Sequence, residues 1–112
     1  MFDKKILLVR NDTTFMVNAI KKSLVDNHFV VAESSYSISD ISANKDDASL
    51  AILYTDSDFI EHQDAIIYFK DLCIEENMIV IVIGDNDAFK FIPQYTLFVQ
   101  LLYLRHIVII TL

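Results

Sequence analysis

The sequence predicts a single doubly wound α/β domain, in which helices cover both faces of a parallel sheet. Three observations favour this class. Short apolar runs rich in β-branched residues alternate along the chain with amphipathic segments of helical period. The chain has 112 residues and is 54% hydrophobic, which supports one core but not two. It has one Gly and one Pro, few for an all-β protein that must turn often.

Four apolar runs predict buried parallel strands, because strands covered on both faces are almost continuously hydrophobic. These runs are residues 6–9, 50–54, 79–83 and 96–99. A weaker run at residues 30–32 suits a strand at the edge of the sheet. The ends of the runs therefore mark where loops and helices begin.

Helical periodicity appears between these runs. A first helix is expected over residues 15–25, with Asp12 or Thr13 as its N-cap and an inward stripe of Met16, Ala19, Ile20 and Leu24. A longer helix over residues 60–76 has an inward stripe of Ala65, Ile66, Phe69, Leu72 and Cys73. Shorter helices are expected over residues 37–43, with Ile38 and Ile41 inward, over residues 87–91 and over residues 103–112.

The apolar stretch at residues 96–112 is at the short limit of about 17 residues for crossing a bilayer. It also contains Arg105 and His106, and a central arginine costs about 2.5–3.5 kcal/mol on insertion scales. We therefore expect a strand followed by a helix here, and no membrane partner.

Composition also limits the possible partners and cofactors. A single cysteine, Cys73, excludes a disulfide scaffold and a thiolate zinc site, and it fits the reducing cytoplasm. Nine Lys and Arg against sixteen Asp and Glu give a formal charge of −7. Because non-specific nucleic-acid binding depends on clustered cations that contact phosphates, we expect no nucleic-acid partner.

Polar side chains follow the predicted strands at their carboxyl ends, where sheets of this class bind ligands. Asp12, Asp56 and Asp85 could form an acidic pocket there, with Asn11 nearby. Carboxylates favour a hard cation such as Mg²⁺, but Arg10 would repel a dication from the same pocket. The alternative is that these carboxylates cap helices or are solvated, so no metal is expected.

Other catalytic and cofactor motifs are missing from the sequence. A single Gly excludes a Walker A loop and a dinucleotide fingerprint. His28, His62 and His106 share no ligand spacing, and Cys73 lies on an apolar stripe, as a core cysteine does. We expect neither a cofactor nor enzymatic activity.

The layout resembles the receiver domain of two-component response regulators, which has the CheY-like, flavodoxin-like fold. Residues 4–9, Lys-Lys-Ile-Leu-Leu-Val, resemble the first strand of that family. Residues 49–53 resemble its third strand, which leads into the phosphoacceptor, and residues 78–84 resemble its fourth. The resemblance covers nearly all of residues 1–112. It implies a (βα)5 domain with sheet order 2-1-3-4-5, at the N-terminal end of a longer signalling protein.

The residues that carry the chemistry of receivers are replaced in this chain. Arg10 and Asn11 stand where the family has two acidic residues that hold Mg²⁺, and Tyr54 stands where an aspartate accepts the phosphoryl group. Ile83 replaces a Ser or Thr, and Leu101 replaces a Lys. The sequence therefore resembles a degenerate receiver, or pseudo-receiver, whose phosphorylation site is lost.

In this interpretation Arg10 takes the place of the metal and pairs with Asp12, Asp56 or Asp85. The domain would bind a protein partner or an output domain without being phosphorylated. A homodimer is expected through a consecutive apolar stretch that cannot turn wholly toward the core: Phe98, Leu101, Leu102, Tyr103 and Leu104. Phe98 also matches the aromatic switch residue of the family.

Two alternatives remain at the level of the sequence. In one, Asp56 accepts the phosphoryl group within a phosphorelay, and Asn11 and Asp12 help to bind the metal. In the other, the chain is a small α/β enzyme that uses Asp12, Asp56 and Asp85, although no base-and-nucleophile pair accompanies them.

Overall fold

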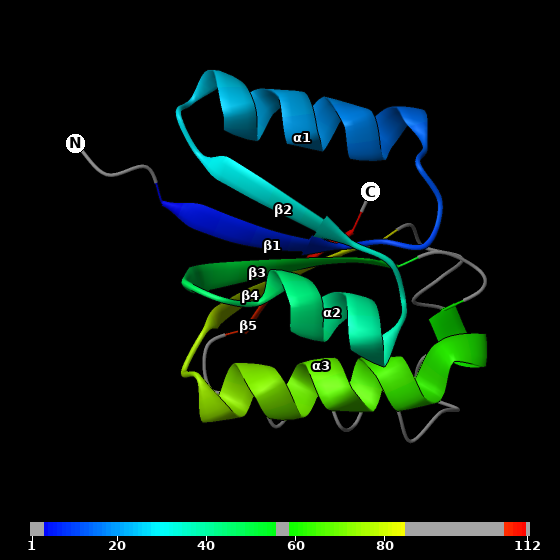
Figure 1. Ribbon diagram of the computed structural model, residues 1–112. Helices are drawn as coiled ribbons and strands as arrows, with labels where there is room; N and C mark the ends of the chain where they lie inside the picture. The colour runs from blue at the N-terminus through cyan, green and yellow to red at the C-terminus, as the bar shows by residue number, and fades with distance from the viewer. Residues whose placement is uncertain (1–3, 56–58, 85–106, 112) are drawn as a thin grey trace.

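The computed structural model describes residues 4–55, 59–84 and 107–111 (Figure 1). Within these ranges five parallel strands form one sheet, in the order β2-β1-β3-β4-β5. Their bounds are β1 Lys5–Val9, β2 Val30–Ser34, β3 Ala48–Thr55, β4 Ile79–Gly84 and β5 Ile107–Thr111. The predicted α/β class and the order 2-1-3-4 are confirmed.

Helices cover both faces of the sheet (Figure 1). Helix α1 (Phe15–Asp26) lies on one face, and α2 (Ile38–Asn44) and α3 (Gln63–Glu75) lie on the other. A 3₁₀ turn, η1 (Phe59–His62), leads into α3. None of the helices in the described ranges is long and apolar enough to cross a membrane.

The placement of the fifth strand differs from the prediction. β5 pairs with β4 from Val80↔Ile107 to Gly84↔Thr111, so the outer strand comes from a later segment than residues 96–99. Its sequence, Ile-Val-Ile-Ile-Thr, is β-branched at every position, and such residues favour strands over helices. The helix predicted over residues 103–112 is therefore wrong for residues 107–111, while residues 87–91 and 96–99 lie outside the described ranges.

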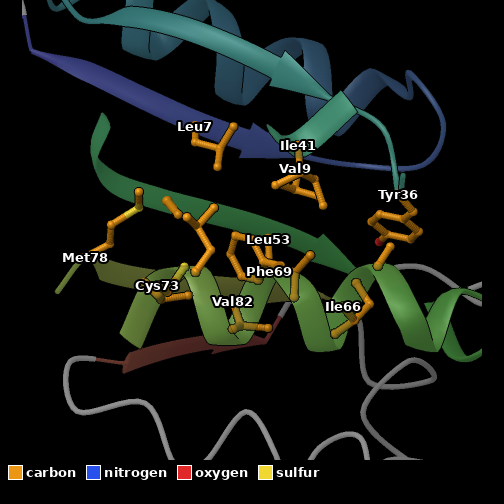
Figure 2. Packing of buried hydrophobic residues seen from close by; sticks show 14 residues of the cluster. Leu7, Val9, Tyr36, Ile41, Leu53, Ile66, Phe69, Cys73, Met78 and Val82 are labelled. Carbon is orange, nitrogen blue, oxygen red and sulfur yellow. The ribbon is translucent and has the colours of Figure 1, made fainter. Parts of the chain in front are cut away.

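The larger core lies between the sheet and the pair α2 and α3 (Figure 2). Phe69, at its centre, has no exposed surface, and Leu7 and Leu53 from neighbouring strands are equally buried. The inward stripe predicted for α3 is confirmed, since Ala65, Ile66, Phe69, Leu72 and Cys73 are all buried. A regular apolar stripe on a long helix is sufficient to fix which face packs on the sheet.

Helix α1 packs on the other face with a stripe that differs from the predicted one. Val17 is fully buried, and Ile20 and Leu24 pack partly buried beside it. Met16 is 36% exposed and Ala19 is exposed. The helix lies beside β2 at the edge of the sheet, so only a narrow stripe is covered.

The start of α1 and the exposure of α2 also differ from expectation. Thr14 is the N-cap, because its Oγ1 accepts the Val17 N–H at 3.2 Å; neither Asp12 nor Thr13 has this role. In α2, Ile41 is buried as predicted, but Ile38 is 46% exposed.

Two helices end in the same way without glycine. After α1, the His28 N–H binds the Val25 carbonyl and the Phe29 N–H binds the Leu24 carbonyl, each at 3.0 Å. After α3, Asn77 and Met78 repeat the pattern at 3.2 and 2.9 Å. These are Schellman motifs. His28 and Asn77 have φ of 69° and 53°, in the left-handed region that is costly for residues other than Gly.

Replacing His28 with Gly should therefore stabilise the domain. We expect His28→Gly to raise the free energy of unfolding by about 0.5 kcal/mol, because relief of the left-handed strain exceeds the added freedom of the unfolded chain. Urea denaturation measures the change. Asn27→Gly is the control: Asn27 has φ of −98°, so glycine gains nothing there and should destabilise. A His28→Gly variant that loses stability would contradict this account.

Candidate functional site

The carboxyl edge of the sheet brings three predicted residues into a row. Val9 pairs with Leu53 across β1 and β3, so Arg10, the next residue, comes beside Tyr54. Tyr54 in turn pairs with Ile83 across β3 and β4. Ile83 and Tyr54 belong to the cluster that packs under α1, so this row lies on the α1 face of the sheet.

Arg10 is held in this row by a carboxylate of the neighbouring strand. Its Nη2 lies 3.6 Å from Glu33 Oε2, and Lys21 Nζ of α1 lies 3.3 Å from the same oxygen. The side chains of Arg10 and Glu33 are only 19% and 22% exposed. Arg10 Nε and Glu33 Oε1 are buried and make no hydrogen bond within the described ranges. Glu33 thus offsets one of the two positive charges that meet at this half-buried site.

Glu33 belongs to the candidate site but was not predicted from the sequence. We predicted Asp12, Asp56 or Asp85 as the partner of Arg10, but Asp12 is exposed and the other two lie outside the described ranges. Glu33 pairs with Leu8 across β1 and β2. Leu8 comes two residues before Arg10, so Glu33 and Arg10 lie on the same face of the sheet. The predicted edge strand ended at residue 32, whereas β2 continues to Ser34.

A second set of contacts joins the ends of β3, β4 and the β2–α2 corner. The Tyr36 hydroxyl donates to the Tyr54 carbonyl oxygen, and the buried Thr55 Oγ1 donates to the Ile83 carbonyl oxygen at 3.2 Å. Neither Tyr36 nor Thr55 was singled out from the sequence. Their hydroxyls add side-chain bonds to backbone carbonyl groups near the ends of β3 and β4.

Asp40 fixes the start of α2. Its carboxylate accepts the Ser35 N–H at 2.8 Å and the Ser35 hydroxyl at 2.9 Å, an arrangement related to the capping box. The backbone bond from Ser35, followed by its hydroxyl bond and by the charge of Arg10, lowers the pKa of Asp40 below the usual 3.8. Arg10 therefore also stabilises the ionised form of this carboxylate in the first turn of α2.

A groove lies between the start of α2 and the η1–α3 junction; we call it the α2–α3 groove. Its volume is about 960 Å³. Its lining includes Tyr36, Ile38, Glu61, His62, Asp64 and Tyr68. The rings of Tyr36 and His62 meet edge to face, with centroids 5.3 Å apart. The sequence pattern gave no signal for Glu61, Asp64 or Tyr68 as site residues and assigned no role to His62.

The remaining predicted residues have these positions. Asn11 follows Arg10 and is half-buried, and its carbonyl oxygen accepts a bond from Arg10 Nη1 at 3.5 Å. Leu101 was assigned from a fifth strand at residues 96–99, and that register does not hold because β5 ends at Thr111. Asp56, Asp85, Phe98, Leu101, Leu102, Tyr103 and Leu104 lie outside the described ranges.

The described part of the chain contains neither a metal-binding cluster nor a reactive thiol. No group of three or more His, Cys, Asp or Glu side chains there could hold a metal ion. Cys73 is 1% exposed, and burial raises its pKa to about 12. Since the thiolate is the reactive form, this thiol is not activated as a nucleophile.

Comparisons with family models, with curated proteins and with solved structures gave no match to this chain.

The Arg10–Glu33 contact can be tested by comparing two ion pairs. Glu33→Gln should lower the free energy of unfolding by about 1–2 kcal/mol, between the values of exposed and buried pairs, because Arg10 stays largely buried without its carboxylate. Asp26→Asn breaks an exposed pair, in which the side chain of Asp26 is 59% exposed and that of Lys22 is 77% exposed. This variant should change the free energy of unfolding by no more than about 0.5 kcal/mol. Urea denaturation measures both. Equal effects would contradict the proposed role of Glu33.

Asp40 gives a prediction about pH. Asp40→Asn should cost about 1 kcal/mol of stability at neutral pH, because it removes the charge that accepts both Ser35 bonds. The folded-state pKa of Asp40 is lowered, so its contribution is complete above about pH 5 and is lost as pH falls through that lowered pKa. Urea unfolding measured across pH should show the two proteins converging in acid. The control is Asp46→Asn, because the Asp46 side chain is 79% exposed. If the stability difference between Asp40→Asn and the unmodified protein did not change with pH, the account would be refuted.

Proposed function

We propose that the domain is a pseudo-receiver: a signalling module related in design to response-regulator receivers, which binds a protein partner without being phosphorylated. The observation that carries the proposal is the row Arg10, Tyr54 and Ile83 at the carboxyl edge. The resemblance places the metal-binding, phosphoaccepting and hydroxyl residues of a receiver at these three positions. The parallel order 2-1-3-4 also supports the proposal.

Each side chain in the row opposes phosphoryl transfer for a chemical reason. A phenol such as that of Tyr54 cannot form the acyl phosphate that an aspartate forms. Arg10 carries a permanent positive charge, which repels the Mg²⁺ that phosphoryl transfer needs. Ile83 has no hydroxyl to bond a phosphoryl oxygen. Because Glu33 lies 3.6 Å from Arg10, the cation is held in place rather than free to move away.

The cellular setting proposed for this module is the cytoplasm. One cysteine in 112 residues, with its thiol buried, fits a reducing compartment where disulfides do not form. A partner protein or an output domain would read the surface of the module, and no catalysis is assigned to it.

Phosphorylation chemistry tests the proposal directly. Treatment with acetyl phosphate and Mg²⁺ should leave the intact mass unchanged, because the metal and acceptor positions are replaced by Arg10 and Tyr54. A receiver with a complete acidic site, treated in parallel, shows that the reagent is active. A phosphoryl adduct that fragmentation maps to Asp56 would overturn the proposal and favour the shifted-acceptor alternative. Unchanged mass in both proteins would call for fresh reagent and a repeat.

We further propose that the module forms a homodimer through Phe98, Leu101, Leu102, Tyr103 and Leu104. The support is the sequence: these apolar residues are too closely spaced for all of them to face the core, and exposed apolar patches commonly mark interfaces. Without a phosphoryl switch, association would be constitutive, or controlled by concentration and by a partner. A two-fold contact of identical surfaces is the simplest form.

Sedimentation equilibrium tests the dimer. The protein should associate at micromolar concentration, and Tyr103→Glu should shift it to monomer, because a charge inside an apolar contact must be desolvated. Phe15→Glu is the matched control, since Phe15 is 88% exposed at the start of α1 and has no part in the proposed interface. A monomer across the whole concentration range would refute the dimer but leave the pseudo-receiver proposal standing.

A further inference from the structure

The α2–α3 groove has walls that the structure holds in a fixed shape. Tyr36 forms part of its lining, and the Tyr36 hydroxyl is bound to the Tyr54 carbonyl oxygen. The edge-to-face contact with His62 joins the Tyr36 ring to the wall formed by the η1–α3 junction. The bonds from Ser35 to Asp40 fix the start of α2, which supplies the other side. A preformed groove spares a ligand the cost of ordering the site.

The charge of the groove has one sign. Glu61 and Asp64 line one wall, and both are exposed. None of the lining residues in the described part of the chain is Lys or Arg. The remaining polar lining includes the hydroxyls of Ser37, Ser39 and Ser42 at and after the N-cap of α2, which can accept hydrogen bonds from a cation. The formal charge of −7 adds a long-range attraction for cations.

The groove also offers apolar and aromatic surface. Ile38 is 46% exposed, although the helical pattern predicts it to point inward, and it lines the groove opposite the carboxylates' wall. Tyr68 is half-buried and lines it too, and a tyrosine ring attracts Lys or Arg through its face. A ligand that matches this lining needs positive charges next to an apolar side chain.

We infer that the α2–α3 groove binds a short basic segment of a partner protein, with Lys or Arg near Glu61 and Asp64 and an aliphatic side chain against Ile38. The inference rests on the groove, its charge and the exposed Ile38. It does not depend on the receiver proposal, because the only contribution of the Arg10 row is the backbone carbonyl of Tyr54, and no side chain of that row is used.

The experiment uses the whole chain labelled with ¹⁵N and a blocked tetrapeptide, Leu-Arg-Leu-Lys, followed by amide chemical shifts at low salt. Saturable shifts should be concentrated at residues 36–42 and 61–68. The double variant Glu61→Gln, Asp64→Asn should weaken binding about fivefold, the value expected for two exposed ion pairs worth together about 1 kcal/mol. Added NaCl should weaken the binding as well.

A matched variant separates the groove from general attraction to an acidic protein. Glu75→Gln, Glu76→Gln removes the same charge from the far end of α3, where both residues are exposed, and should leave the affinity unchanged. Ile38→Ser should weaken binding without any change in charge. The inference is overturned by shifts spread over the acidic surface, by equal weakening in both double variants, by equal binding of Leu-Glu-Leu-Glu, or by no saturable shift at millimolar peptide.

Discussion

The burial of β1 between two helical layers is the constraint on which the rest of the structure depends. Its four apolar residues are no more than 3% exposed and alternate between the two cores: Leu7 and Val9 face α2 and α3, Ile6 and Leu8 face α1. Lys5 and Arg10 bound the run, so sliding the strand by one residue would bury a cation. The same limit fixes Arg10 beside Tyr54 and within reach of Glu33.

The amino and carboxyl ends of the strands are stabilised by different means. At the amino edge, helices end in backbone motifs whose left-handed positions fall on His28 and Asn77 rather than on glycine. At the carboxyl edge, side chains bind backbone: Thr14 caps α1, Tyr36 binds the Tyr54 carbonyl, and Thr55 binds the Ile83 carbonyl. Strain therefore sits where no site was predicted, and the edge that carries the candidate residues is held by specific hydrogen bonds.

The sequence was informative wherever a local pattern is sufficient. The existence of the four strands up to residue 84 follows from continuous apolar runs, and the buried stripe of α3 follows from its helical period. Three neighbouring polar residues can each cap α1, and backbone geometry selects Thr14. Glu33 could not be found, because its contact with Arg10 depends on strand register across 23 residues of chain. The β5 segment carried a usable signal, since its β-branched run opposes a helix, but two apolar runs competed for one position in the sheet.

Tyr36 connects the carboxyl edge with the α2–α3 groove. Tyr36 lines the groove with its ring and binds the end of β3 with its hydroxyl. In a receiver that is phosphorylated, chemistry at the end of β3 would change which state a partner meets. On the function proposed for this chain no such chemistry occurs, so the contact holds a single arrangement. A partner then meets a preformed surface. Because every molecule has the binding conformation, the apparent affinity is not lowered by a population that cannot bind. Regulation would lie in the supply of the partner rather than in a switch within the domain.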